Sequence, residues 1–222
     1  MTQWNLPALL DHTVLRPEAT KTDVLRLCRE AKDLGFVVIF VPPCYVDEAV
    51  AATVGSTVRV GIPIGFPLGG HTTKAKVAEA TEAVARGAQI LDMVIDVSRL
   101  KSGDQAFVRQ DIAEVVKATP SAEHKVILET CLLTQQEKIT ACHLVVEAGA
   151  DYVKTSTGFS TAGATVEDVR LMKQTVAGKA KVKASGGIRD WKTTMAMLEA
   201  GADRIGTSAS LKILEEWKAS QK

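Results

Sequence analysis

The chain has 222 residues, of which 46% are hydrophobic, 24% charged and 5% aromatic, and its formal net charge is +1. This length suits one α/β barrel domain over residues 1–222 and is too short for two independent α/β domains. The low aromatic content argues against a β-sandwich or a base-stacking nucleic-acid module, and the balanced charge provides no broad field that would attract DNA or a membrane.

Strand-like and helix-like segments alternate along the whole chain. Between the strands lie amphipathic helical patterns such as KTDVLRLCREAKDLG and TKAKVAEATEAVARG. Capping boxes are expected at three helix starts, namely Thr20 with Asp23, Thr134 with Glu137 and Thr165 with Asp168. The predicted strands are, in chain order, Leu9–Val14, Val37–Val41, Val58–Ile62, Ile90–Ile95, Lys125–Glu129, Tyr152–Thr155, Lys181–Ala184 and Arg204–Gly206.

An internal repeat favours a closed barrel. The segments ARGAQILD, EAGADYVK and EAGADRIG align without gaps on Gly87, Gly149 and Gly201, and DLGFVVIF follows the same rhythm from Gly35. Each interval is long enough for two strand–helix units. A doubly wound open sheet alternates in the same way, but no GxGxxG follows the first strand and no break marks a reversal of strand order. We therefore predict a single (β/α)8 TIM barrel.

Two lysines and an aspartate are predicted to share the mouth of this barrel. Five residues after each repeat glycine lie Phe40, Asp92, Lys154 and Gly206, which would place them at one level near the carboxyl ends of alternate strands. Lys183 lies near the end of the seventh strand, directly before ASGG. The alternative is an ion-paired plug of the barrel end. Two lysines against one carboxylate make a plug less favourable, because one buried ammonium stays uncompensated.

The two lysines are expected to differ in protonation. Burial and a neighbouring ammonium both lower a lysine pKa, and we expect about 7–8 for Lys154 in place of about 10.4. A neutral amine attacks a carbonyl carbon, so Lys154 is the expected Schiff-base residue. Lys183 is expected to hold that pKa down, and Asp92 to orient Lys183 and a water in a proton relay.

The segments after the last two strands predict a phosphate site. Glycines in ASGGIRD and RIGTSAS allow backbone N–H groups to approach a ligand, and each segment opens a helix whose N-terminus favours an anion. Barrels often bind phosphate at this pair of loops. The predicted binding residues are Gly186, Gly187, Gly206 and Ser208, with Gly158, Thr207, Arg189 and Ser210 as further candidates.

Two other segments are of interest near the predicted mouth. The loop GFPLGGHTTK, residues 65–74, is expected to border it. His71 is not a metal candidate, because no other histidine or cysteine lies at ligand spacing. In LDHTVL, Asp11 and Thr13 have the opposite parity to His12, and a substrate contact and a core hydrogen bond stay open as equal alternatives.

The first residues and the cysteines indicate the cellular compartment of the protein. MTQWNLPALLDHTV has neither a basic leader nor a continuous apolar core, so no secretory signal is expected. The most hydrophobic run, FVVIFVPPC, is short and ends in two prolines, so it is not expected to span a bilayer. The four cysteines show no CxxC spacing, and a reducing, cytoplasmic location is expected.

Six segments, in order and over nearly the whole chain, resemble the successive motifs of the 2-deoxyribose-5-phosphate aldolase family. They are LLDHTVLRPEAT, IGFPLGG, LDMVID, YVKTSTGFSTAGATVEDV, VKASGGIR and RIGTSAS. The resemblance implies a class I aldolase, without metal or other cofactor, that reversibly cleaves 2-deoxy-D-ribose 5-phosphate to D-glyceraldehyde 3-phosphate and acetaldehyde. By motif, Lys154 matches the family's Schiff-base lysine, Lys183 its second lysine and Asp92 its relay aspartate. The loops after strands seven and eight match its phosphate clamp.

Two departures from the family accompany this resemblance. Some members carry a cysteine where this chain has Phe40, with Cys44 only nearby, so thiol capture of unsaturated aldehydes should be absent at that position. Some members end in a tail whose terminal tyrosine assists proton transfer. This chain ends EEWKASQK, so that assistance is expected to come from elsewhere or to be missing.

Two other functions are kept as alternatives. One is a phosphosugar isomerase or epimerase on the same barrel, with Asp92 as its base. The other is a non-catalytic phosphometabolite-binding protein. The expected partners are small phosphosugars and aldehydes, and a homodimer is the candidate assembly.

Overall fold

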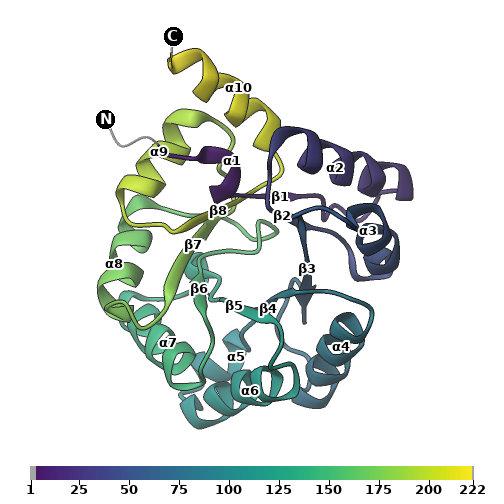
Figure 1. Cartoon of the computed structure of the whole chain (residues 1–222). Coiled ribbons are helices and arrows are strands. Elements are labelled where there is room, and N and C mark those ends of the chain that lie inside the picture. The colour runs from purple at the N-terminus through teal and green to yellow at the C-terminus, as the bar shows by residue number, and fades with distance from the viewer. Residues whose placement is uncertain (1–3, 222) are drawn as a thin grey trace.

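Eight parallel strands close into a barrel in the computed structural model, which describes residues 4–221 (Figure 1). Each strand pairs with the next in the chain, and the last pairs with the first, where Asp11 lies opposite Gly206. The strands are β1 (Leu10–Thr13), β2 (Val38–Phe40), β3 (Arg59–Ile64), β4 (Ile90–Val94), β5 (Glu123–Ile127), β6 (Tyr152–Lys154), β7 (Lys181–Ser185) and β8 (Arg204–Thr207). The predicted (β/α)8 barrel is confirmed, and an open sheet is excluded.

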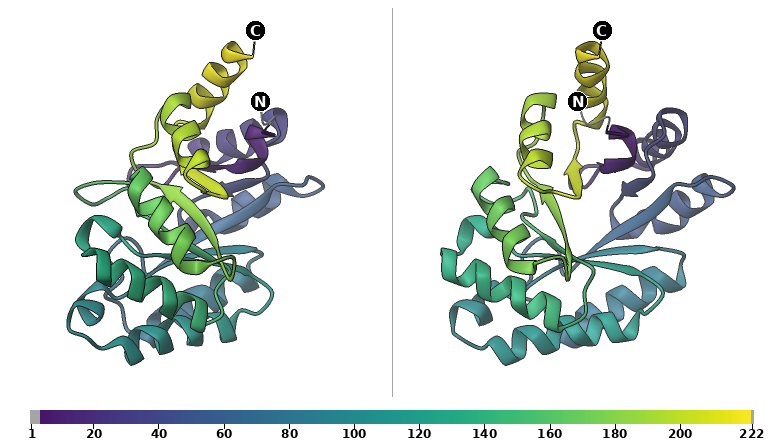
Figure 2. Two further views of the ribbon diagram at one scale, coloured as in Figure 1. Left: turned by 90° about the vertical axis from the view of Figure 1, so that its left-hand side faces the viewer. Right: turned by 60° about the vertical axis from the view of Figure 1, so that its left-hand side comes forward.

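Helices form a ring outside the strands. The elements α1 and α10, from opposite ends of the chain, lie on the same side of the barrel (Figure 2). Within residues 4–221, no helix is long and apolar enough to cross a bilayer. The helices are α1 (Leu6–Leu9), α2 (Lys21–Leu34), α3 (Val46–Thr53), α4 (Thr73–Ala85), α5 (Val97–Lys101), α6 (Gln105–Ala118), α7 (Gln135–Glu147), α8 (Val166–Val176), α9 (Trp191–Glu199) and α10 (Ser210–Ser220), with the short 3-10 turns η1 (Pro43–Tyr45) and η2 (Thr130–Leu132).

The predicted strands all exist, and the largest difference in their bounds is at β5. This strand was expected over Lys125–Glu129 but runs from Glu123 to Ile127. The reason is local, because Glu129 has a φ of 54°, in the left-handed region that an extended strand cannot contain. The chain therefore leaves the sheet before Glu129 and turns into η2.

Two of the three predicted capping boxes are present, at Thr20 and at Thr134. The third is only half formed. The Thr165 side chain accepts from the Asp168 backbone N–H at 3.0 Å. The Asp168 carboxylate, however, accepts from Lys138 of α7 at 2.5 Å. An interhelix ion pair has therefore replaced the reciprocal bond of that box.

The barrel interior is unusually polar for a packed core. Side chains two residues apart on a strand point to the same face. The inward side chains of the even-numbered and the odd-numbered strands form successive layers along the barrel axis. The layer nearest the carboxyl ends of the strands contains the four residues that were predicted to lie at one level, one from each even-numbered strand. From the amino to the carboxyl ends, the three layers are Val38, Ile90, Tyr152 and Arg204, then Asp11, Gly61, Lys125 and Lys183, then Phe40, Asp92, Lys154 and Gly206.

Candidate active site

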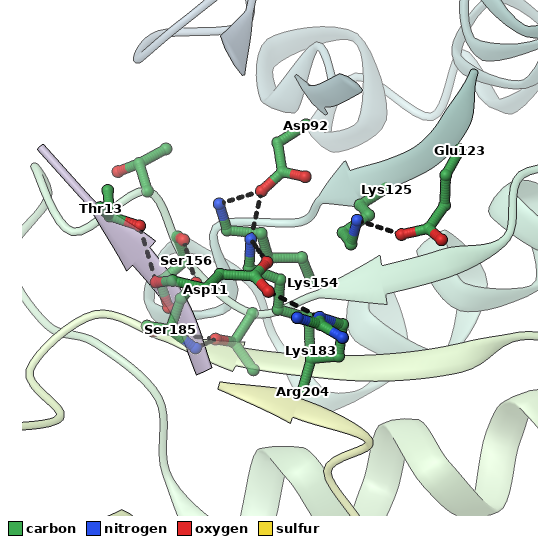
Figure 3. Close-up of polar contacts among 12 residues, drawn as sticks. Asp11, Thr13, Asp92, Glu123, Lys125, Lys154, Ser156, Lys183, Ser185 and Arg204 are labelled. Carbon is green, nitrogen blue, oxygen red and sulfur yellow. Dashed lines mark hydrogen bonds and ion pairs between the residues drawn. The ribbon is translucent and has the colours of Figure 1, made fainter. Parts of the chain in front are cut away.

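Two lysine ammonium groups meet on one carboxylate at the mouth of the barrel (Figure 3). Lys154 Nζ on β6 donates to Asp92 Oδ2 on β4 at 2.6 Å, and Lys183 Nζ on β7 donates to the same oxygen at 2.7 Å. All three side chains are buried, with Lys154 5% exposed. The structure thus brings the three predicted catalytic residues together. It also adds the direct bond between Lys154 and Asp92, which the sequence analysis did not anticipate.

A second carboxylate completes the cluster. Asp11 Oδ2 on β1 lies 2.5 Å from Lys183 Nζ, and its Oδ1 accepts from Arg204 Nε at 2.6 Å. The expectation of one carboxylate against two lysines is therefore wrong. Asp11 is a buried ion-pair partner, whereas Thr13 borders the cavity described below and donates its hydroxyl to the Asp11 carbonyl. Asp11 and Thr13 thus lie on the same face of β1, as their spacing predicts, but have different roles.

Burial lowers the pKa of Lys154 from 10.5 to about 8. The attraction of Asp92 acts in the opposite direction, and the repulsion of Lys183 adds to the lowering. Lys183 thus contributes in the expected direction, but loss of solvation is the larger cause. With a pKa of about 8, about one molecule in ten carries a neutral amine at pH 7, compared with about one in three thousand for an ordinary lysine.

Lys183 is shifted in the opposite direction. Burial acts to lower its pKa, but the charges of Asp11 and Asp92 outweigh burial and raise it above the ordinary lysine value. For Asp92, burial is likewise outweighed, here by Lys154 and Lys183, so its pKa lies below the ordinary value. In active sites, neighbouring titratable groups often have pKa values shifted in opposite directions, so that one group releases its proton while the other stays protonated.

A third lysine lies beneath this cluster and was missed by the sequence analysis. Lys125 is fully buried and pairs with Glu123, two residues before it on β5. Its ammonium lies 4.9 Å from the centre of the Tyr152 ring, and burial is the main cause of its lowered pKa. The available signal was a lysine inside the apolar run HKVIL, with the inward parity of the barrel interior.

A cavity of about 730 Å³ opens from Lys154 and Lys183 to the surface. Ser210 does not border it, because its buried hydroxyl donates to the Thr207 carbonyl at 3.3 Å. The prediction that the Ser210 side chain contacts a ligand is therefore wrong. The other predicted binding residues all border the cavity, namely Gly158, Gly186, Gly187, Gly206, Ser208, Thr207 and Arg189.

These cavity residues are suited to different tasks. Gly186 and Gly187 have φ values of 85° and 77°, so the turn after β7 uses backbone that other residues rarely adopt. Gly206 instead makes room for a neighbour, since a Cβ there would lie 2.8 Å from Lys183 Cε. The Thr207 hydroxyl is already engaged, because it donates at 2.7 Å to the carbonyl of Ile188 in the loop after β7.

The two helix N-termini expected to attract an anion are not equivalent. At α9, the Asp190 side chain accepts from the Thr193 N–H, so a carboxylate of the protein already caps this helix. At α10 the N-cap residue is Ala209, and no side chain caps the first turn. Of the two, α10 is therefore the N-terminus whose N–H groups are available to a phosphate.

The remaining wall of the cavity comes from an unexpected element. Arg16 precedes α2, and Asp23, Arg26 and Glu30 of α2 all border the cavity. Their charged pattern is that of an ordinary solvated helix face, so the sequence carried no specific signal for them. The loop over residues 65–74 does not itself border the cavity. Its Phe66 packs edge-on against Phe159, which does, with the two ring centres 5.3 Å apart. Within residues 4–221, no group of three potential metal ligands is found.

The fold and the site together define a class. A (β/α)8 barrel that presents a buried amine of lowered pKa at the carboxyl ends of its strands is suited to covalent chemistry on carbonyl compounds. The sequence profile described as "DeoC/LacD family aldolase" matches residues 7–216. The chain belongs to this family of aldolases.

Individual relatives agree with this assignment. A deoxyribose-phosphate aldolase of Thermoanaerobacter sp. is 54% identical, over 96% of this chain and 97% of its own length. That of Brevibacillus brevis is 53% identical, over 95% of each chain. Among solved structures, "QR15, an Aldolase" superposes with a TM-score of 0.94 at 43% identity, covering 99% of this chain and 98% of its own. The tetrameric deoxyribose phosphate aldolase of Aeropyrum pernix gives 0.90 at 36% identity, covering 97% and 92%.

Proposed function

We propose that this aldolase reversibly cleaves 2-deoxy-D-ribose 5-phosphate to D-glyceraldehyde 3-phosphate and acetaldehyde through a Schiff base on Lys154. The observation that carries the proposal is the shared contact of two lysines with Asp92, in which Lys154 has a pKa of about 8 and Lys183 stays charged. The names of the relatives support the substrate, since they are deoxyribose-phosphate aldolases.

The neutral amine of Lys154 begins the reaction. It attacks the C1 aldehyde of the open-chain sugar to give a carbinolamine, which loses water to become an iminium. Removal of the C3 hydroxyl proton then allows the C2–C3 bond to break, with its electron pair moving into the iminium. Glyceraldehyde 3-phosphate leaves, the resulting enamine is protonated at C2, and water releases acetaldehyde and restores the amine.

Asp92 and Lys183 are proposed to manage the protons. Asp92 alone is a poor base, because its pKa is lowered by both lysines. Its Oδ1 atom, however, has no hydrogen-bond partner among the residues described, and can accept a hydrogen bond from a hydroxyl group or a water. The charged Lys183 fixes the other oxygen and favours the ionised form of Asp92. A proton therefore passes through a hydrogen-bonded relay and does not come to rest on the carboxylate.

The substrate phosphate is proposed to bind at the opposite wall of the cavity. The glycine pair after β7 exposes backbone, the uncapped first turn of α10 offers N–H groups, and Arg189 and Ser208 border the same region. This arrangement combines the dipole of a helix N-terminus with a guanidinium charge. It would hold the 5-phosphate while C1 reaches Lys154.

Reductive trapping tests the central step. With acetaldehyde or the sugar phosphate present, borohydride should fix one adduct, and peptide mapping should place it on Lys154. A Lys154→Met variant should show no adduct, and a Lys181→Met variant, altered at an exposed lysine of β7, should be trapped normally. Catalysis without an adduct on Lys154 would contradict the Schiff base and favour isomerase or epimerase chemistry at Asp92.

We further propose a cytoplasmic location and self-association. The four cysteines at positions 28, 44, 131 and 142 form no disulfide, in keeping with a reducing compartment. A solved relative is described as tetrameric, which supports assembly into at least a homodimer. Light scattering on the purified protein measures the assembly directly, and a monomer at micromolar concentration would contradict it.

A further inference from the structure

Phe40 lies among the ammonium groups of the barrel. The centre of its ring is 3.9 Å from Lys183 Nζ, 5.6 Å from Lys154 Nζ and 5.8 Å from Lys125 Nζ. The side chain is 1% exposed. Each ammonium loses hydration when it is buried beside this ring. Apolar packing alone therefore does not explain why three lysines surround it.

The ring occupies a place that β3 leaves open. Gly61 lies opposite Phe40 in the sheet, and a Cβ on Gly61 would lie 2.5 Å from the ring. In the layer of Asp11, Gly61, Lys125 and Lys183, the ring of Phe40 therefore fills the position of the missing side chain. The glycine fixes where the ring lies, and Lys183 is placed over its face.

The face of an aromatic ring is electron-rich and attracts a cation within about 6 Å of its centre, most strongly when water is excluded. Lys183 is well inside that range, while Lys154 and Lys125 are near its limit. The ring therefore stabilises the charge of Lys183 more than that of Lys154. This difference has the same sign as the effect of Asp11, which bonds Lys183.

We propose that Phe40 is a positioning residue, whose ring face holds Lys183 as the charged lysine so that Lys154 is the one that releases its proton. This inference rests on the proposed function, because it assumes that the reaction needs a neutral Lys154 beside a charged Lys183. An apolar filler would contribute shape alone, and any ring of equal volume would then serve equally well.

Other charges also act on Lys183, and the carboxylates in the barrel are too few to neutralise all of its cations. Two carboxylates and three further cations face it from the surrounding strands. Glu123 pairs with Lys125, so three carboxylates are shared by four cations once Lys183 is counted, and an uncharged group that favours a cation is useful here. The facing groups are Asp11 on β1, Asp92 on β4, Lys125 on β5, Lys154 on β6 and Arg204 on β8.

Fluorinated phenylalanines separate charge from shape. Introduced at position 40, 4-fluoro-, 3,5-difluoro- and pentafluorophenylalanine keep nearly the same volume but progressively remove the electron-rich face. The readout is the alkaline limb of the pH profile of kcat/KM, which reports loss of the essential proton of Lys183 in the free enzyme. We expect this limb to move to lower pH along the series, by about one pH unit for the pentafluoro ring. The acid limb, set by Lys154, should move less.

Controls distinguish this inference from the function on which it rests. Pentafluorophenylalanine at Phe36, a buried ring that packs on His12, should leave both limbs in place. Phe40→Leu, which lacks a ring face, should move the alkaline limb as the pentafluoro ring does. If both limbs stay constant across the series in folded protein while borohydride trapping on Lys154 is normal, the role of Phe40 is overturned and the proposed function is not. Absence of trapping in the unmodified enzyme would overturn the proposed function and this inference with it.

Discussion

Replacing Lys183 with methionine tests whether the charges at the site are coupled as the contacts indicate. Lys183 repels a proton on Lys154 and also neutralises Asp92, which attracts that proton. Without Lys183, Asp92 would act on Lys154 with no competing cation on the same oxygen. We therefore expect the pKa of Lys154 to rise from its value of about 8.

The contacts set the size of this effect. Both nitrogens bond to the same Asp92 oxygen, at 2.6 and 2.7 Å, so they lie at most about 5.3 Å apart. At an effective dielectric constant of about 20, two unit charges at that separation repel by about 3 kcal/mol, which corresponds to about two pKa units. The pKa of Lys154 should then approach about 10, and its neutral fraction at pH 7 should fall about 100-fold.

The assay is the rate of borohydride trapping of acetaldehyde on Lys154 as a function of pH. This rate follows the neutral amine and does not require the proton transfers of the full reaction, in which Lys183 also takes part. Its midpoint should move from about 8 to about 10 in Lys183→Met. It should stay near 8 in Lys183→Arg, which keeps the charge, and in Lys181→Met, which alters an exposed lysine of the same strand.

A midpoint that remains near 8 in folded Lys183→Met would refute the coupling and leave burial as the whole cause. Folding has to be checked, because removing one partner of a buried ion pair costs about 3–5 kcal/mol. If the single variant does not fold, the double variant Asp11→Asn with Lys183→Met removes one of the two carboxylates left without Lys183. The same midpoint is then read in that protein.

Three further outcomes are expected. Because Asp92 raises the pKa of Lys154, Asp92→Asn should move the trapping midpoint below about 8, and a midpoint that moves upward would contradict this sign. Lys76 is buried and pairs with Asp111 at 2.6 Å, so Lys76→Met should lower the free energy of unfolding in urea by about 3–5 kcal/mol. Most of that loss should return in Lys76→Met with Asp111→Leu. All four cysteines lie within the described residues and none borders the cavity, so an α,β-unsaturated aldehyde should not inactivate the enzyme, whereas Phe40→Cys should make it sensitive.

Much of the site could be predicted because its signals are local. The parity of a strand and its position before a turn depend on residues only a few places apart, and these assigned Lys154, Lys183 and Asp92 to one end of the barrel. The glycine pair after β7 was recognised in the same way, since a left-handed turn restricts the residue type directly. The Ser210 assignment failed because sequence alone does not say which way a side chain at a helix start will point.

The sequence by itself determined eight strand–helix units and the strand ends that carry the lysines, because hydrophobic periodicity and turn residues act over short distances along the chain. Only the tertiary structure decided which charges meet. Asp11 and Arg204 are 193 positions apart, and closure of β8 onto β1 brings them together. The same closure buries Lys154 and thereby shifts its pKa. Solvation and ion pairing depend on every strand around a group, and that environment does not exist until the barrel is complete.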